Sequence, residues 1–437
     1  MAKKLTPTKI KKSLLEIIKS LASTPEAFVR RPGRDFSRNR KLSFETMLKM
    51  LVGMGGNSLC KELYEWFDFD VDTASVAAFV QQRDKILPTA LEALFHEFVS
   101  ACDETVLFNG YRLLAADGSD LRLPANSSDT ETYFKNNSDD AKGYNLVHLD
   151  AIYDLLRHVY VDASIQLKKG QNEHRALVSM VDRSKLPRNV ILMADRGYES
   201  FNNIAHLQEK GWKYIIRAKD SFGIITKTTL PASKEFDIST IVTLTKRQTK
   251  LTRALFKENP SRYRWVPPHA TFDYLETREN AMYDLQIRIV RFPISDGTYE
   301  TVFTNLDPDD FPAKTLKQLY NMRWGIETSF RELKYTIGLA GLHCKKRDSM
   351  LQEVFARLVL YNFSELIVSL ANVPRDRACK INFSAAIHVC RQYFRGNLKD
   401  QILLEIIARH LSPIRPNRNF PRYQKHLSAM SLTYRIA

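Results

Sequence analysis

Between residues 111 and 220, apolar segments typical of strands alternate with amphipathic segments typical of helices. Two β-rich runs separated by Leu155 and Leu156 predict a hairpin, and the segments after it read as helix, strand, helix and strand. An antiparallel start followed by β-α-β units restricts the fold to a mixed sheet with helices packed over it. The sequence therefore predicts an α/β core. Strands are expected near 111–117, 144–154, 157–166, 189–195 and 212–220, and helices near 171–183 and 201–211.

The rest of the chain differs from this core in composition and in the secondary structure it predicts. Short helices and a basic loop are expected before it, and a Thr-, Val-, Ile- and Tyr-rich stretch with several prolines predicts a β-rich insertion. A return strand near 300–306 leads into a helix near 316–335 and an apolar helix over 349–372. We therefore expect a helical basic region at 1–108, the core in two parts at 109–219 and 301–372, a β-rich insertion at 220–300, and a basic helical region at 373–437.

The net charge of +16 is concentrated at the two ends of the chain. Residues 1–41 and residues 373–437 each carry a net charge of +9, which leaves −2 for the residues between them. Two basic ends around a near-neutral body favour a polyanionic partner, either DNA or RNA. A charge that only improves solubility is the alternative. The phosphate-contact candidates in the first basic loop are Arg30, Arg31, Arg34, Arg38, Arg40 and Lys41.

Cysteine usage and hydropathy exclude several classes of protein. The five cysteines form no CxxC pair, so neither a zinc site nor a disulfide framework is indicated. No apolar run approaches the roughly 18 residues of a membrane span. We expect a protein of a reducing cytosol, with no membrane partner.

Four polar residues of the expected 316–335 helix share one face. Tyr320, Arg323, Glu327 and Lys334 have offsets of 0, 3, 7 and 14, which at about 100° per residue places them within roughly 60° of one another. The simplest interpretation is a solvated helix face with an i,i+4 ion pair between Arg323 and Glu327, worth a few tenths of a kcal/mol. The carboxylates elsewhere in the chain favour a different interpretation.

Asp117 and Asp195 each follow an apolar strand-like run, where open α/β sheets place functional groups. Turn formation and helix capping are the alternatives for either residue alone. With Glu327 from a helix, three carboxylates from separate elements would repel one another unless cations neutralise them. Oxygen ligands without nearby His or Cys indicate Mg²⁺ or Mn²⁺, and two such ions suit phosphodiester chemistry.

These residues resemble the DDE transposases of bacterial insertion sequences, specifically the insertion-sequence-4 family. The resemblance lies in Asp117 in a D-G-S turn, Asp195 in D-R-G-Y, and the Y-x2-R-x3-E-x6-K pattern at 320–334, and it spans the whole chain. It implies an RNase H-like core, a mixed five-stranded sheet with flanking helices that the β-rich insertion interrupts. It also implies Asp117, Asp195 and Glu327 as ligands of two metal ions. Implied contacts to DNA phosphates are Tyr320, Arg323, Lys334, Arg196 and Arg217.

The family resemblance further implies cut-and-paste transposition through a DNA hairpin, with strand transfer into target DNA. The expected partners are double-stranded DNA, namely the terminal inverted repeats and the target, and a second copy of the chain in a synaptic dimer. An aromatic side chain from the insertion would stack on a flipped base. Relatives often carry Trp at the start of the return strand, whereas this chain reads GTYETVF there, so the candidates are Tyr299 and Trp265.

Two other functions fit the same residues. An RNase H-like nuclease would share the three acids but would not join DNA strands, and a DNA-binding remnant of a transposase would do neither reaction. A phosphatase with an Asp nucleophile is disfavoured because D-G-S-D at 117–120 lacks the D-x-D signature.

Overall fold

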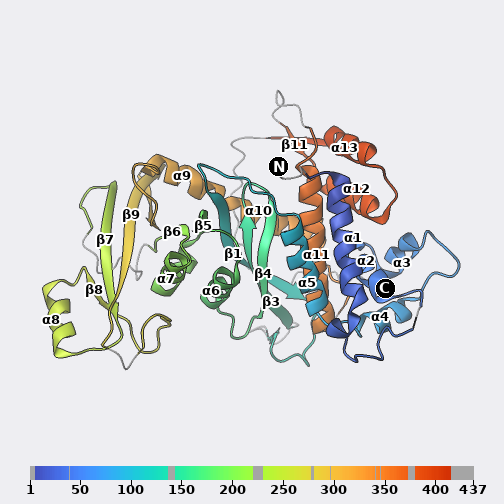
Figure 1. The fold of residues 1–437 in the computed structure, drawn as a ribbon, viewed down its shortest axis with the longest axis horizontal. Coiled ribbons are helices and arrows are strands. Elements are labelled where there is room, and N and C mark those ends of the chain that lie inside the picture. Colours follow the sequence, from blue (N-terminus) through green and yellow to red (C-terminus); the bar gives the residue numbers. More distant parts are fainter. Residues whose placement is uncertain are drawn as a thin grey trace.

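A computed structural model of the protein describes residues 5–38, 40–135, 143–219, 230–276, 280–295, 297–339, 341–344, 346–372 and 379–414. In these residues a helical half and a sheet half lie side by side along the longest axis of the molecule (Figure 1). None of the helices described has the length and apolarity that crossing a membrane requires.

The helical half is built around α11 (Arg347–Val368), which is buried along almost its entire length. Helix α1 (Pro7–Ser23) begins at Thr6, whose side chain caps it, and its apolar residues at intervals of three and four form one buried face, as the sequence predicts. The other helices of this half are α2 (Phe44–Gly53), α3 (Leu59–Trp66), α4 (Val76–Arg83), α5 (Thr89–Ala101), α12 (Phe383–Arg395) and α13 (Asp400–Arg409), with a short 3₁₀ turn η1 (Pro25–Phe28). The helical character expected of the N-terminal region is thus observed in its described residues, 5–38 and 40–108.

One mixed sheet of ten strands runs through the described part of the sheet half. Its strands follow the order β2-β3-β1-β5-β6-β10-β9-β7-β8, and β4 pairs with β3. Their bounds are β1 (Arg112–Leu123), β2 (Tyr133–Phe134), β3 (Tyr144–Asp154), β4 (Val159–Leu167), β5 (Val190–Ala194), β6 (Lys213–Arg217), β7 (Phe236–Thr245), β8 (Tyr263–Trp265), β9 (Tyr283–Ser295) and β10 (Thr298–Thr304).

The expected core lies in the middle of this sheet. The hairpin of β3 and β4 is observed, β3 is antiparallel to β1, and β5 and β6 continue parallel to β1. Helices α6 (Glu173–Arg183) and α7 (Phe201–Glu209) connect β4, β5 and β6 as predicted and pack together with one face of the sheet. The opposite face of β1 packs into a second core with α5 and α11.

The β-rich insertion is not separate from this sheet. Strand β10, which corresponds to the expected return strand, pairs with the outer edge of β6. Strands β9, β7 and β8 of the insertion follow it, so the sheet extends beyond the five strands expected. Pairing to β6 satisfies backbone groups that would otherwise form an open edge. Helix α8 (Lys250–Glu258) is the one helix described within this extension, at the far end of the molecule (Figure 1).

The expectation that the first core strand ends at Asp117 is wrong. Strand β1 continues through Asp117 and Gly118 to Leu123, and it pairs with β3 over this whole length. Gly118 is tolerated in mid-strand because the buried imidazole of His148 on β3 fills the space that a Cβ would take. The Gly-Ser pair therefore marks a close side-chain approach rather than a turn.

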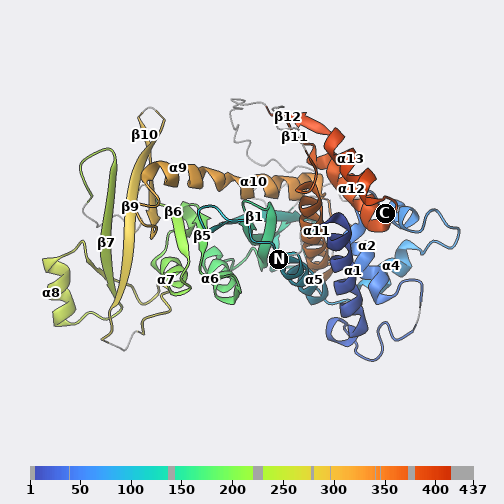
Figure 2. The same cartoon turned by 45° about the horizontal axis from the view of Figure 1, so that its top comes forward.

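The expected single helix over 316–335 consists of three successive pieces. Helix α9 (Ala313–Met322) and helix α10 (Trp324–Arg331) run nearly in line on either side of Arg323, as Figure 2 shows. A π-helical turn, η4 (Glu332–Thr336), follows directly and carries Lys334. Because a π turn is wider than an α turn, the even 100° spacing assumed for Lys334 does not hold there.

The C-terminal region contains α12 and α13, which agrees with the helical character expected of it in the part that is described. Two short strands, β11 (Cys379–Ile381) and β12 (Leu411–Pro413), pair antiparallel beside them and were not expected. The last part of the basic tail that the sequence singles out, 415–437, and the segment 373–378 lie outside the described residues.

Candidate active site

The three acidic residues come from β1, the end of β5 and α10. Along β1, Leu113 and Ala115 belong to the core shared with α10 and α11, whereas Leu114 and Ala116 belong to the core shared with α6 and α7. Side chains alternate along a strand, so Asp117 continues the first set and lies on the α10 side of the sheet.

Asp195 lies at the same level on the neighbouring strand. The parallel register pairs Ala116 with Ala194, and Asp117 and Asp195 are the next residues of β1 and β5. Strand β5 ends where the sequence predicts. The Asp195 carboxylate accepts a 2.7 Å hydrogen bond from the N–H of Gly197 and caps a 3₁₀ turn, η2 (Arg196–Tyr198). One Asp195 oxygen thus fixes the local turn.

Arg323 connects Glu327 to Asp117. Its Nη2 donates to Glu327 Oε1 at 2.8 Å, and its Nη1 lies 3.7 Å from Asp117 Oδ2. The guanidinium is buried, and such a paired charge in a partly dry site interacts more strongly than an exposed pair. The helix pair anticipated between Arg323 and Glu327 is therefore present, and it reaches across to the sheet.

The electrostatics of Asp117 show that the three acids act on one another. Burial, with smaller contributions from the charges of Asp195 and Glu327, raises the pKa of Asp117 to about 6. The N–H of Gly118, which donates to Asp117 Oδ1 at 2.9 Å, and the Arg323 guanidinium oppose this rise. An additional cation close to such a carboxyl would stabilise its charged form.

The donor chemistry fits a divalent cation, but Arg323 lies between two of the donors. The carboxylates offer hard oxygen ligands of the kind that Mg²⁺ and Mn²⁺ prefer. Within the described part of the chain, however, no group of three or more His, Cys, Asp or Glu side chains is arranged so that it could hold a metal ion. The guanidinium supplies the positive charge near Asp117 and Glu327 in this arrangement.

Tyr320 and Lys334 lie beside this group. Tyr320 is buried, its hydroxyl has no hydrogen-bond partner among the described residues, and Arg323 lies 5.5 Å from the centre of its ring. Burial raises the pKa of Tyr320 to about 12, so it stays a phenol. Lys334 donates to Ser119 Oγ at 2.7 Å and to the Asp120 carbonyl at 2.8 Å, which ties η4 to β1 just beyond Asp117.

The other DNA contacts expected in the core come from two further elements, η2 and β6. Arg196 is exposed on η2. Arg217 ends β6 and pairs with Glu300 on β10 at 3.1 Å, and its charge together with that of Glu300 influences Tyr320. Of the two aromatic candidates, Trp265 lies on the short strand β8 and donates to the Lys246 carbonyl, whereas Tyr299 on β10 is half-buried beneath Arg291.

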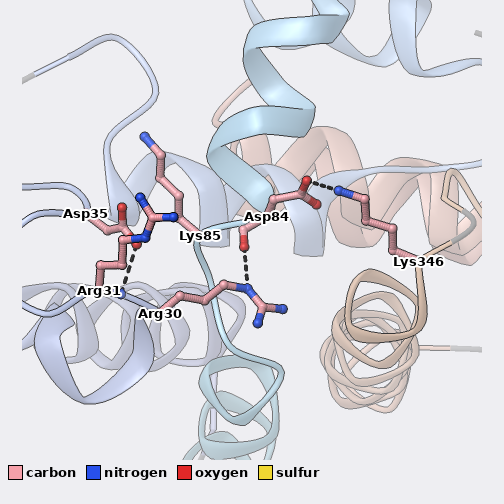
Figure 3. A pocket seen from close by; sticks show the side chains of 6 residues that line it. All are labelled: Arg30, Arg31, Asp35, Asp84, Lys85 and Lys346. Atoms are coloured by element: carbon pink, nitrogen blue, oxygen red, sulfur yellow. Dashed lines mark hydrogen bonds and ion pairs between the residues drawn. The ribbon is translucent and has the colours of Figure 1, made fainter.

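The cations of the basic loop at residues 30–41 fall into three sets. Arg30 and Arg31 line a pocket together with Asp35, Asp84, Lys85 and Lys346 (Figure 3). Lys41 instead donates to the Asp72 carbonyl and covers the Phe67 ring. The remaining cations expected to contact phosphates, Arg34, Arg38 and Arg40, are exposed.

Sequence reasoning missed a buried polar cluster on the opposite face of β1. His148 Nδ1 lies 2.7 Å from Asp120, and its Nε2 lies 3.2 Å from Glu173 and 3.5 Å from Asp150. Burial lowers the pKa of His148, but the hydrogen bonds to these carboxylates outweigh it and raise the pKa to about 11. A His two residues before an Asp within an apolar strand run was the available signal.

Comparison with known families identifies the chain. Residues 108–363, more than half of the sequence, match the model of the transposase DDE domain, and this range holds Asp117, Asp195 and Glu327. The chain belongs to the DDE transposases. It is therefore an enzyme of DNA transposition, and the divalent metal ions that such domains normally use agree with the carboxylate donors described above.

No curated protein matches the sequence of this chain. Among solved structures, the cryo-EM structure of a piggyBac transposase synaptic complex with hairpin DNA matches with a TM-score of 0.48 and 9% sequence identity. The match covers 96% of this chain and 88% of that chain.

Proposed function

We propose that this DDE transposase is of the insertion-sequence-4 type and performs cut-and-paste transposition at Asp117, Asp195 and Glu327. One observation carries the proposal: the Arg323 guanidinium contacts both Asp117 and Glu327, while Asp195 lies level with Asp117 on the adjacent parallel strand. Three acids that are far apart in the sequence thus belong to one electrostatic group in a domain of the matching family.

The central strands agree with an RNase H-like core. In the order β4-β3-β1-β5-β6, β3 runs antiparallel to its neighbours β4 and β1, whereas β1, β5 and β6 are parallel. Asp117 lies on the middle strand and Asp195 follows its parallel neighbour, so both acids emerge where the sheet changes from antiparallel to parallel pairing. We assign residues 109–219 and 301–372 to this core and residues 220–300 to the insertion that extends it.

Asp117, Asp195 and Glu327 would hold two Mg²⁺ or Mn²⁺ ions, whose chemistry is to activate the attacking hydroxyl and to stabilise the leaving oxygen of a phosphodiester. The chain's own residues do the positioning. Gly118 and Gly197 direct one oxygen of each aspartate through backbone N–H groups, and Arg323 orients Glu327.

Arg323 and Lys334 would bind phosphates of the transposon end, with Tyr320 beside them. The buried hydroxyl of Tyr320 has a free donor that a phosphate oxygen can accept, since no described residue pairs with it. A phosphate drawn toward Arg323 would compete with Asp117 and Glu327 for the same guanidinium. Arg196 and Arg217 extend this proposed DNA surface, with Trp265 and Tyr299 as the proposed stacking residues.

Synapsis of two transposon ends would require a dimer of the chain on DNA. The reaction would begin with hydrolysis of one strand at the element end, continue through a hairpin and finish with joining to target DNA. Each stage leaves a DNA product of different length or topology, so the three stages can be scored separately.

The test uses purified protein, Mg²⁺ and duplex DNA that carries the inverted repeats flanking its gene. Wild type should give a nick with a free 3′-hydroxyl, a hairpin end and products joined to target DNA. Glu327→Gln should lower cleavage by at least about 10²-fold while it still binds the duplex. Asp310→Asn, a change at an exposed carboxylate in the loop before α9, is the matched control and should cut as wild type does.

The rival functions give different outcomes. Cleavage without joined products would identify a nuclease, and binding without cleavage in the presence of Mg²⁺ or Mn²⁺ would identify a DNA-binding remnant. Equal cleavage by wild type and Glu327→Gln would show that the three acids do not form the active site.

A further inference from the structure

A basic pocket lies where the N-terminal helical region meets the start of α11. It has a volume of about 400 Å³ and is lined by four cationic and two acidic side chains, namely Arg30, Arg31, Lys85, Lys346, Asp35 and Asp84 (Figure 3). Lys85 and Lys346 stand 55 and 316 residues from Arg30 in the sequence, so only the fold brings these charges together.

The backbone that carries these cations is held by pairing rather than being a free loop. Val29 forms an antiparallel bridge with Ile86, and the Arg30 N–H donates to the Lys85 carbonyl at 2.9 Å. Lys346 caps α11, the central helix of the helical half. A pocket with such a fixed frame loses little freedom when a ligand binds.

The two acids neutralise only part of the positive charge. Asp84 pairs with Lys346, and its backbone carbonyl accepts from Arg30 Nε, while Arg30 also pairs with Asp348 at the rim. The Asp35 carboxylate accepts from the backbone N–H of Arg31 at 3.0 Å. Arg30 and Lys346 are therefore each matched by a carboxylate.

Arg31 and Lys85 are not matched in this way. Neither side chain has a carboxylate within ion-pair distance in the part of the chain that the structure describes; Lys85 donates only to the neutral amide of Gln82 at 2.7 Å. The two lie together on one side of the pocket, and the Asp84–Lys346 pair lies on the other (Figure 3). The Asp35 carboxylate lies beside them, on the backbone N–H of Arg31, and offsets one of the two charges. This side of the pocket therefore keeps a net positive charge that an anion can neutralise.

We propose that this pocket binds a backbone phosphate of duplex DNA, held by Arg31 and Lys85 and supported by Arg30 and Lys346. The assignment rests on the proposed function, in which DNA is the substrate. The pocket itself is formed by other elements than those that carry Asp117, Asp195 and Glu327. A planar guanidinium and an ammonium suit a phosphodiester, one by paired hydrogen bonds and the other as a point charge. Such a contact fixes the position of the DNA without reading its sequence.

The test compares DNA binding by wild type and by Arg31→Ala/Lys85→Ala over a series of salt concentrations. The Kd of the double variant should rise about tenfold near 100 mM salt, and the slope of log K against log salt should become shallower by roughly 1 to 2. The loss should be equal for the transposon-end duplex and for a duplex of unrelated sequence, because a phosphate contact carries no base readout. Lys61→Ala/Lys399→Ala, which removes two exposed cations elsewhere in the helical half, should leave the Kd unchanged.

Other outcomes are equally decisive. An unchanged Kd and slope for Arg31→Ala/Lys85→Ala would overturn the pocket assignment. Cleavage by wild type is scored in parallel, so a protein that binds through the pocket but never cuts refutes the proposed function alone.

Discussion

Replacing Asp117 by asparagine should make the protein more stable at neutral pH. The folded pKa of Asp117 is about 6 against an ordinary 3.8, and its burial together with the charges of Asp195 and Glu327 is the cause. A carboxyl whose pKa is raised by folding stabilises the fold most when it is protonated in both states. That stability is lost as the pH rises from about 4 through 6. The difference of about 2 pKa units corresponds to about 3 kcal/mol at pH 7.

The amide of the Asp117→Asn variant does not titrate, and its side-chain oxygen can still accept from the Gly118 N–H. The free energy of unfolding of Asp117→Asn should therefore exceed that of wild type by less than about 1 kcal/mol at pH 4 and by about 3 kcal/mol at pH 7. A gain of several degrees in the unfolding midpoint is expected.

The measurement is thermal unfolding, without metal, of wild type, Asp117→Asn and the control Asp310→Asn in steps from pH 4 to pH 8. The control should follow wild type throughout, because Asp310 is exposed. Adding Mg²⁺ at pH 7 should stabilise wild type more than Asp117→Asn, since the variant lacks one of the proposed ligands. An Asp117→Asn protein that is no more stable than wild type at pH 7, or a gap of the same size at pH 4, would refute the reasoning.

Three further expectations concern the residues around the acids. Arg323→Ala should bind Mn²⁺ more tightly than wild type in calorimetry without DNA, because it removes the cation that lies between two carboxylate donors. Arg331→Ala removes an exposed cation from the same helix and should bind Mn²⁺ as wild type does. Equal affinities for all three proteins would contradict this role of Arg323. Lys334→Ala should weaken binding to transposon-end DNA and make the salt slope shallower by about 1, whereas an unchanged slope would show that its hydrogen bonds to β1 keep it from DNA. Gly118→Ala should lower the free energy of unfolding by about 1–3 kcal/mol, since the new methyl group overlaps His148. Adding His148→Ala to the same chain should recover part of this loss. A Gly118→Ala protein with the free energy of unfolding of wild type would argue against the close packing.

Local patterns were read correctly where neighbouring residues decide the structure. The five-residue apolar run before Asp195 predicts a buried strand that ends there, and β5 ends at Ala194. The i,i+4 spacing of Arg323 and Glu327 predicts their ion pair, which is present at 2.8 Å. In both cases the residues that decide the structure belong to a single strand or to neighbouring turns of a helix, so their spacing in the sequence fixes their geometry.

Local patterns misled where a distant residue decides. Gly-Ser after Asp117 resembles a turn, yet β1 runs on because β3 pairs with it and His148 fills the space beneath Gly118. The β-rich insertion has the composition of a separate domain, yet its strands continue the sheet because β6 offers an open edge. The even helical spacing assumed for Lys334 fails at the π turn.

By itself the sequence determined the α/β character of the core, the three candidate acids, the ion pair on the motif helix and the basic character of both ends. These depend on composition and on spacings within single elements. Only the tertiary structure decided that Arg323 reaches Asp117, that a buried His148 packs against the strand carrying this acid, and that Arg31 meets Lys85 in one pocket. Contacts of this kind join residues dozens to hundreds of positions apart, and their energies depend on distances and burial that arise only when the elements pack.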